Sequence, residues 1–172
     1  RALAKNVNKQ EKKIMGVILA AGNSTRMGKD NKLLRNIDGA PLIRNIALEI
    51  TKSDLDSCSI VLGYQSDKVA DVIKDLNINL ILNPLWKEGQ ASSLKAALNS
   101  LTSSYSDVLI MLGDLPGIKS SHINRIIEEH LSSENRRSKI TIPSFKGERG
   151  NPVIWGKSFF HDLSNLEGDV GG

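Results

Sequence analysis

Hydrophobic and polar positions along the chain follow two alternating patterns. Short continuous apolar runs, which are typical of strands covered on both faces, are separated by longer segments whose apolar residues recur at helical spacing. The runs that predict strands are 15–20, 59–63, 79–82, 108–112 and 140–142.

Four of the intervening segments predict helices. Pro41 is a favoured first helical residue, and apolar residues follow it at helical spacing from 42 to 50. Ser66 can cap a second helix whose apolar face extends to Leu76, a third runs from about 90 to 101, and a fourth follows Ser120 or Ser121. Strands that alternate with such helices predict an α/β fold of three layers, α/β/α, with a Rossmann-like, mostly parallel sheet.

Length and composition are those of one ordinary globular domain. The 172 residues are 40% hydrophobic and 24% charged, with a net charge of +4. Residues 1–13 carry five of the 23 basic side chains and one of the 19 acidic ones, so residues 14–172 hold 18 of each. We therefore expect residues 1–13 to be a basic linker or a remnant of an adjoining segment, and residues 14–172 to form the domain. A neutral domain with 4% aromatic residues argues against nucleic-acid binding.

Several other classes of chemistry are disfavoured. No apolar run approaches the roughly 20 residues that span a bilayer, so we expect a soluble, cytoplasmic protein without a membrane partner. Cys58 is the only cysteine, which excludes an intrachain disulfide, and its apolar surroundings predict a buried, unreactive thiol. The spacing of His122, His130 and His161 indicates structural or surface roles rather than a metal site.

The loop after the first predicted strand is the strongest candidate for function, because ligands of such sheets bind at the carboxyl ends of strands. Its small residues allow backbone amides to approach an anion closely, and Arg26 and Lys32 add positive charge at the same rim. The loop is suited to a polyphosphate, although its spacing is neither that of a Walker loop nor that of a dinucleotide fingerprint. A tight turn with solvated basic residues is the alternative. The candidate binding residues are Leu19, Ala20, Ala21, Gly22 and Gly28.

Asp114 is the second candidate, because it follows the predicted strand 108–112 at the same edge of the sheet. A carboxylate there can hold a Mg²⁺ ion bound to phosphates, whereas the alternative is a turn residue ahead of Pro116. The segment from Gly89 to Leu94 opens the third helix, where its amides and hydroxyls could face a nucleotide, with Gly89 and Ser93 as the candidate residues; the alternative is that Ser92 or Ser93 satisfies the helix's first turn. Asp169 is a further carboxylate, in a glycine-rich stretch that by itself is typical of a frayed terminus.

Seven segments of the chain form a recognisable set when they are taken in order. They are LAAGNSTRMG (19–28), NKLL (31–34), NPLW (83–86), GQASSL (89–94), GDLP (113–116), RGNPV (149–153) and GD (168–169). This set resembles the molybdenum cofactor cytidylyltransferases, within the MobA-like nucleotidyltransferase family, which also contains guanylyltransferases of the same cofactor and sugar-phosphate nucleotidyltransferases. The resemblance covers residues 15–172 and implies a fold of the nucleotide-diphospho-sugar transferase type.

The resemblance implies transfer of CMP from CTP to the phosphate of a molybdopterin-type cofactor, with release of pyrophosphate. The first loop then cradles the phosphates, with Arg26 on the leaving pyrophosphate and Lys32 near the α-phosphate. By the same resemblance, Asp114 and Asp169 are the Mg²⁺ ligands, and Gly89 and Ser93 lie beside the base and ribose. Arg149, Asn151 and Pro152 match the segment on the acceptor side, where Asn151 is alternatively a turn residue.

The substrate assignment leaves alternatives open. The order Ala20-Ala21-Gly22 is similar to the cytidylyl branch and favours CTP, but guanylyl transfer and a sugar-phosphate acceptor are alternatives. If the protein is not an enzyme, the alternative is a nucleotide-binding module for cofactor insertion. The family continues beyond the GDVG segment with Ala-Arg, so we expect this domain to be truncated, and the basic N-terminal stretch resembles a junction with a molybdopterin-binding domain.

Overall fold

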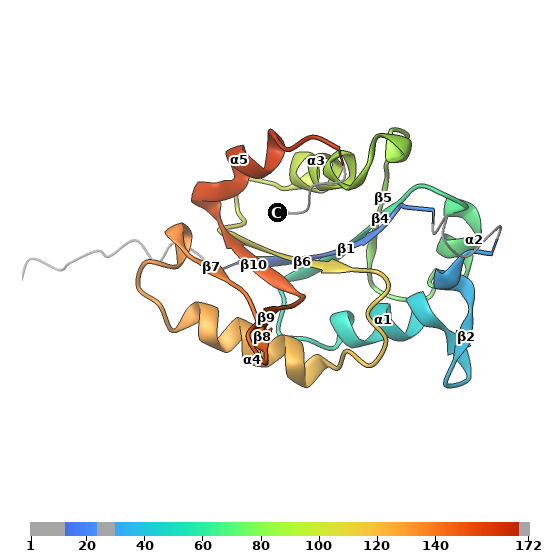
Figure 1. Cartoon of the computed structure of the whole chain (residues 1–172), viewed down its shortest axis with the longest axis horizontal. Coiled ribbons are helices and arrows are strands. Elements are labelled where there is room, and N and C mark those ends of the chain that lie inside the picture. The colour runs from blue at the N-terminus through green and yellow to red at the C-terminus, as the bar shows by residue number, and fades with distance from the viewer. Residues whose placement is uncertain (1–12, 24–29, 169–172) are drawn as a thin grey trace, which may run out of the picture.

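The computed structural model describes residues 13–23 and 30–168, which form a central sheet between two layers of helices (Figure 1). The sheet has six strands in the order β5-β4-β1-β6-β10-β7. This three-layer, mostly parallel α/β arrangement confirms the fold class predicted from the sequence. The strands are β1 (Ile14–Ala20), β4 (Ser57–Leu62), β5 (Asn79–Leu82), β6 (Asp107–Leu112), β7 (Ile140–Thr141) and β10 (Val153–Gly156).

Strand direction divides the sheet into two parts. β1 pairs in parallel with both β4 and β6, and β5 pairs in parallel with β4. β10 runs antiparallel to β6 and β7. The five predicted strands are present to within two residues at each end, whereas β10 was not predicted. Its four residues, Val153–Gly156, follow directly after Pro152 and are too few to show a period.

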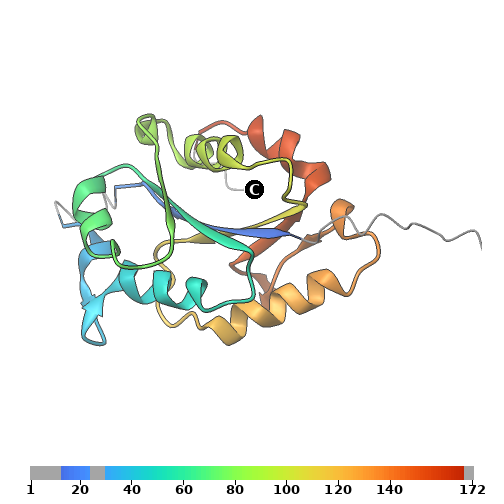
Figure 2. The same cartoon turned by 180° about the vertical axis from the view of Figure 1, so that it is seen from behind.

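Helices cover both faces of the sheet, as the pattern predicted. α1 (Leu42–Thr51) and α4 (Ser120–Leu131) lie on one face, and α3 (Gln90–Ser100) and α5 (Phe160–Ser164) on the other (Figures 1 and 2). α2 (Ser66–Asp71) is shorter than predicted, because the chain turns after Asp71, although Ile73 beyond it is fully buried. None of the helices in the described part of the chain is long and apolar enough to cross a membrane.

Short elements connect these layers. They are the 3-10 turns η2 (Lys32–Leu34), η3 (Trp86–Glu88), η4 (Arg136–Ser138) and η5 (Lys157–Phe159), and the hairpins β2 (Asn36–Ile37) with β3 (Ala40–Pro41) and β8 (Ser144–Phe145) with β9 (Glu148–Arg149).

The core consists of two apolar clusters, one on each face of the sheet. Successive residues of β1 point alternately into the two clusters, so that Val17 and Ile18 are both fully buried. Cys58 is buried as well, and this burial raises the pKa of its thiol to about 11, which confirms the expected buried thiol. The edge strand β5 departs from the prediction of two covered faces, because Leu80 and Leu82 are 50% and 65% exposed.

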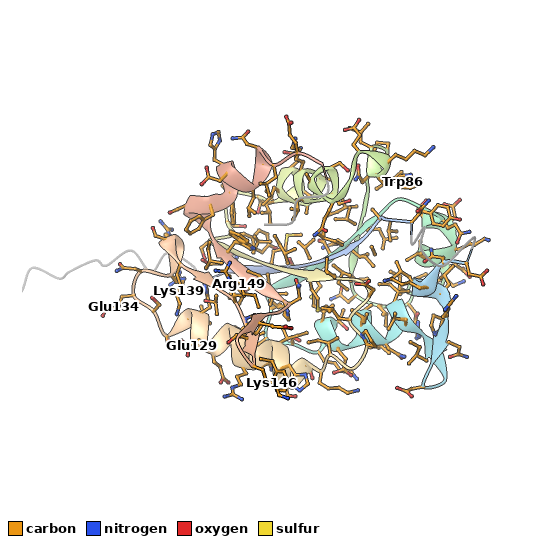
Figure 3. The ribbon with its side chains drawn as sticks, viewed as in Figure 1. Trp86, Glu129, Glu134, Lys139, Lys146 and Arg149 are labelled. Atoms are coloured by element: carbon orange, nitrogen blue, oxygen red, sulfur yellow. The ribbon has the colours of Figure 1, made fainter. Side chains whose placement is uncertain are left out.

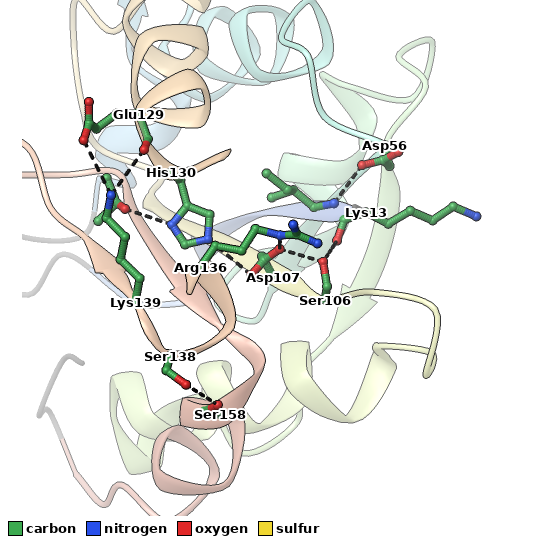
Figure 4. A network of polar contacts seen from close by, with 12 residues as sticks. Lys13, Asp56, Ser106, Asp107, Glu129, His130, Arg136, Ser138, Lys139 and Ser158 are labelled. Carbon is green, nitrogen blue, oxygen red and sulfur yellow. Dashed lines mark hydrogen bonds and ion pairs between the residues drawn. The ribbon is translucent and has the colours of Figure 1, made fainter. Parts of the chain in front are cut away.

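A buried polar network joins the amino end of β6 to α4 and β7 (Figure 4). Asp107 is fully buried and accepts hydrogen bonds from the Ser106 hydroxyl at 2.6 Å and from Arg136 Nε at 3.2 Å. His130, also fully buried, lies 3.2 Å from Asp107 through Nε2 and 2.8 Å from Thr141 Oγ1 through Nδ1. The geometry gives His130 a structural place, at the end of the sheet opposite the candidate functional loops.

Candidate functional site

The carboxyl ends of β1 and β6, together with the start of α3, line an open cavity of about 1040 Å³. It lies where a doubly wound sheet places its ligands. The cavity brings together most of the described residues that the sequence singled out. Those that line it are Leu19, Ala20, Ala21, Gly22, Lys32, Gly89, Ser93 and Asp114.

Neighbouring backbone holds the loop after β1 in place. The Leu19 carbonyl accepts a hydrogen bond from Gly113 N at 2.9 Å, and the Ala21 carbonyl accepts one from Tyr64 N at 2.9 Å. Gly22 faces open space, since a Cβ built there meets no atom within 4 Å. The backbone at Gly22 is therefore accessible to a ligand. Arg26 and Gly28, which the sequence assigned to the phosphates, lie outside the described residues.

Lys32 and Asp114 form an ion pair in the cavity, in which Lys32 Nζ donates to Asp114 Oδ2. Asn31 positions Lys32, because its side-chain oxygen accepts from Leu33 N at 3.0 Å and caps the η2 turn. The two charged side chains are 37% and 33% exposed. The site thus holds an accessible cation suited to phosphate oxygens and an accessible carboxylate suited to a divalent cation.

The start of α3 forms a second wall of the cavity. Gly89 has a φ of +98°, which turns the chain into the helix, and Ser93 is 4% exposed and lines the cavity. Neither Ser92 nor Ser93 caps the helix: the Ser92 hydroxyl donates to the Gly89 carbonyl at 2.8 Å. Ser92 therefore does hydrogen-bond within the first turn of the helix, as one alternative proposed, but through a carbonyl rather than an amide.

Asn83 adjoins the site without lining the cavity, and the sequence singled it out only as part of the NPLW segment, with no role of its own. It is 3% exposed, and its side-chain nitrogen lies 2.9 Å from Ser92 Oγ and 3.1 Å from Ser93 Oγ. Its position immediately after a strand and before Pro84 was the available signal.

Trp86 also lines the cavity and packs against Tyr64, with 5.6 Å between ring centroids. Gly63 allows this packing, because a Cβ there would lie 2.5 Å from Trp86 Cβ and 2.7 Å from the Ala21 carbonyl oxygen. Trp86 therefore joins the β4–α2 connection to the wall of the cavity.

The predicted acceptor-side residues lie apart from the described cavity lining. Arg149, in β9, and Asn151 are exposed, while Pro152 is buried and follows a cis peptide bond. Figure 3 places Arg149 well away from Trp86. Because Val153 pairs with Ile110, the antiparallel register continues Pro152 and Asn151 toward the carboxyl end of β6. Asn151 thus approaches the same edge of the sheet as Asp114.

Of the two carboxylates that the sequence assigns to a divalent cation, only Asp114 lies among the described residues. Asp114 offers an accessible carboxylate, which fits Mg²⁺, since that ion is usually bound through one or two carboxylates together with substrate phosphates. Among residues 13–23 and 30–168, no three His, Cys, Asp or Glu side chains converge as a metal site would need. Asp169 lies outside the described residues, but Gly168 before it lines the cavity and its carbonyl accepts from Ala91 N at 3.0 Å.

Comparison with known proteins gives a family for this arrangement. Residues 16–172 match the family described as the MobA-like NTP transferase domain. The bifunctional protein GlmU of Rhizobium rhizogenes is 31% identical over 155 residues, which cover 88% of this chain and 33% of that protein. The chain therefore spans about a third of the length of this curated relative. GlmU is the name that such relatives carry, rather than molybdenum cofactor cytidylyltransferase.

Solved structures give the same fold. Rv0371c from Mycobacterium tuberculosis H37Rv is 26% identical, with a TM-score of 0.78 over 93% of this chain and 79% of that one. A structure of Rv0371c in complex with manganese matches with 23% identity and a TM-score of 0.74, over 92% of this chain and 78% of that one.

Proposed function

We propose, from the premise that the chain belongs to the MobA-like NTP transferase domain family, that it transfers a nucleoside monophosphate from a nucleoside triphosphate to a phosphate group of an acceptor. One observation carries this proposal. Lys32 and Asp114 pair inside a cavity whose other walls are the accessible backbone of the loop after β1 and the start of α3. A cation, a carboxylate and an open glycine loop at one edge of the sheet suit a metal-bound triphosphate.

In this reaction an oxygen of the acceptor phosphate forms a bond to the α-phosphorus. The bond from the α-phosphorus to the bridging oxygen breaks, and pyrophosphate leaves with that electron pair. The nucleophile is already an anion, so the protein supplies positioning and charge neutralisation rather than a general base. Lys32 is proposed to neutralise the α-phosphate, while Arg26 and the loop from Ala20 to Gly28 bind the β- and γ-phosphates.

Asp114, together with Asp169, is proposed to hold Mg²⁺. Bound there, the ion neutralises phosphate charge during the transfer. The manganese complex of Rv0371c supports the use of a divalent cation in a protein of this fold. Lys32 leaves its pairing with Asp114 when the triphosphate arrives, because the α-phosphate then provides its counter-charge.

CTP is proposed as the triphosphate and molybdopterin-type molybdenum cofactor as the acceptor. The sequence Ala20-Ala21-Gly22, on the wall of the cavity, favours a cytidylyltransferase. The register of β10 brings Asn151 toward the edge of the sheet at which Asp114 lies, which supports an acceptor on that side of the site. Arg149 and Pro152 belong to the same segment.

The test is pyrophosphate release with each of the four ribonucleoside triphosphates, in the presence of Mg²⁺ and either a phosphorylated pterin or a hexose phosphate. We expect release with CTP and the pterin. Release with GTP but not CTP would overturn the cytidylyl assignment, and release only with the hexose phosphate would overturn the acceptor. Nucleotide binding without release from any pair would favour the module for cofactor insertion.

A further inference from the structure

Ser93 forms part of the wall of the cavity, and Asn83 lies behind that wall. The backbone N–H of Asn83 donates to the Leu62 carbonyl at 2.8 Å, which ties the residue to the end of β4. Its side chain reaches two buried hydroxyls at the start of α3, those of Ser92 and Ser93. Only Ser93 lines the 1040 Å³ cavity, whereas Ser92 borders a separate groove along α3.

The direction of these hydrogen bonds follows from Leu85. The backbone N–H of Leu85 lies 3.0 Å from Asn83 Oδ1, and an N–H can only donate, so the amide oxygen of Asn83 must face Leu85. The amide NH₂ therefore faces the serines, and both serine oxygens accept from it. Asn83 thereby fixes the polarity of both hydroxyl groups.

The two serine hydroxyls differ in the acceptors that are available to their own hydrogens. Ser92 has backbone acceptors within reach, the carbonyls of Gly89 at 2.8 Å and Leu85 at 2.9 Å. Within the described residues, the Ser93 hydroxyl makes no hydrogen bond other than the one it accepts from Asn83. Its hydrogen is thus available on the side of the cavity.

We propose that Asn83 is a positioning residue that fixes Ser93 as a hydrogen-bond donor toward the bound nucleotide. The site then selects a nucleotide that presents an acceptor atom, an oxygen or an unprotonated ring nitrogen, at the start of α3. The inference rests on the proposed function, because the ligand is the nucleoside triphosphate named there.

The Asn83→Asp substitution tests the direction of these hydrogen bonds, because it changes the shape of the side chain very little. A carboxylate still accepts from Leu85 N, but it offers no hydrogen to either serine. Ser93 then turns its own hydrogen toward residue 83 and presents a lone pair to the ligand's acceptor. We expect the dissociation constant of CTP to rise about tenfold, the size of one lost hydrogen bond. The change should be in KM more than in kcat.

The experiment measures CTP binding in the presence of Mg²⁺ by calorimetry for the wild type, Asn83→Asp, Ser93→Ala, the double variant and Ser92→Ala. We expect each of the first two substitutions to weaken binding about tenfold, and the double variant to be no weaker than Ser93→Ala alone, because Asn83 acts through Ser93. Ser92→Ala is the matched control and should stay within about twofold of the wild type, since Ser92 does not line the cavity.

Three outcomes would overturn the inference. The first is a CTP dissociation constant that is unchanged in Asn83→Asp, and the second is a double variant whose loss of CTP affinity is the product of the two single losses. The third is a loss of CTP affinity in Ser92→Ala equal to that in Ser93→Ala. If circular dichroism shows that Asn83→Asp does not fold, Asn83→Ala replaces it in the same cycle with the same criteria. If the wild type binds another of the four triphosphates more tightly than CTP, that triphosphate is the probe.

Pyrophosphate release is measured separately, so the two proposals fail in different ways. If the wild-type protein binds CTP but releases no pyrophosphate, the proposed function is overturned. The role of Asn83 is then still decided by the CTP affinities of the variants. A wild type that binds none of the four triphosphates overturns both.

Discussion

Lys32 donates a hydrogen bond to Asp114, although 82 positions separate the two residues in the sequence. The pairing occurs because β1 and β6 are adjacent parallel strands, and the chain that follows each of them ends at the same edge of the sheet. Each group neutralises the other while both remain about one-third exposed. The free protein thus carries its candidate catalytic cation and carboxylate together in one place.

Asp114→Asn is expected to lower the rate of pyrophosphate release at least about a hundredfold, because an amide is a poor Mg²⁺ ligand and carries no charge. The free energy of unfolding should change by less than about 1 kcal/mol, since partly exposed ion pairs contribute little. Stopped-flow or coupled assays of pyrophosphate and urea titrations check the two parts. A variant that keeps the wild-type rate would remove Asp114 from the catalytic machinery.

The elements that sequence reasoning predicted are those whose signals are local. The continuous apolar run of β1 and the apolar stripe of α1 each lie within about ten consecutive residues, and both are present in the structure. The loop after β1 and Asp114 could be predicted as neighbours because parallel strands share an edge.

What could not be predicted depends on pairing between distant segments. Asp107 and His130 are 23 residues apart, and no local pattern marks either as buried. Asn83 acquires its place from Leu85 and two serines of the next helix, a geometry that only the fold provides. β10 takes its position from β6, since its own four residues are too few for a period.

Gly22→Ala is expected to leave stability unchanged and to weaken nucleotide binding. A Cβ at this position meets no protein atom within 4 Å, and Gly22 is not among the glycines with positive φ, so an alanine fits the free protein. A phosphate that approaches the backbone closely would collide with the new methyl group. We expect the thermal midpoint to stay within about 2 °C and the CTP dissociation constant to rise about tenfold.

Gly63→Ala is the contrasting control, because its Cβ would lie 2.5 Å from Trp86 Cβ and 2.7 Å from a backbone oxygen. This variant should lose about 1–3 kcal/mol of stability through overpacking. Unchanged CTP affinity in Gly22→Ala would show that the nucleotide does not approach this glycine.

Cys58 is expected to be inert in the folded protein. Burial raises the pKa of its thiol to about 11, so about one molecule in a thousand carries the thiolate at pH 8. A chromogenic disulfide reagent at pH 8 should react slowly with the native protein and release one equivalent of thiolate within minutes in 6 M guanidinium. Fast stoichiometric reaction of the native protein would contradict the buried placement.

The network around Asp107 predicts how stability depends on pH. Burial by itself raises the pKa of Asp107, but hydrogen bonds from His130, Ser106 and Arg136 outweigh it, and the pKa lies below its ordinary value. A carboxylate whose pKa is lowered by folding stabilises the native state above its unfolded pKa, near 4. That contribution is lost as the pH falls below about 4 toward the folded pKa.

Asp107→Asn removes this titration and leaves His130 and Arg136 facing a neutral amide inside the protein. We expect the variant to lose about 2–4 kcal/mol of unfolding free energy at pH 7, the range for disrupting a buried charged network. The difference from the wild type should narrow as the pH falls below 4, because the wild-type carboxylate then becomes protonated. Urea titrations at pH 7, 5 and 3 measure both quantities.

Asp75→Asn is the matched control for this prediction, since Arg44 lowers the pKa of the Asp75 carboxyl to about 2 in an ion pair at the surface, where the Asp75 side chain is 59% exposed. Solvent screens that pair, so its removal should change stability far less than the loss of Asp107. A difference between the wild type and Asp107→Asn that stays constant from pH 7 to pH 3 would show that the Asp107 charge does not stabilise the fold. Because the network lies at the amino ends of the strands, pyrophosphate release by folded Asp107→Asn should stay within about twofold of the wild type.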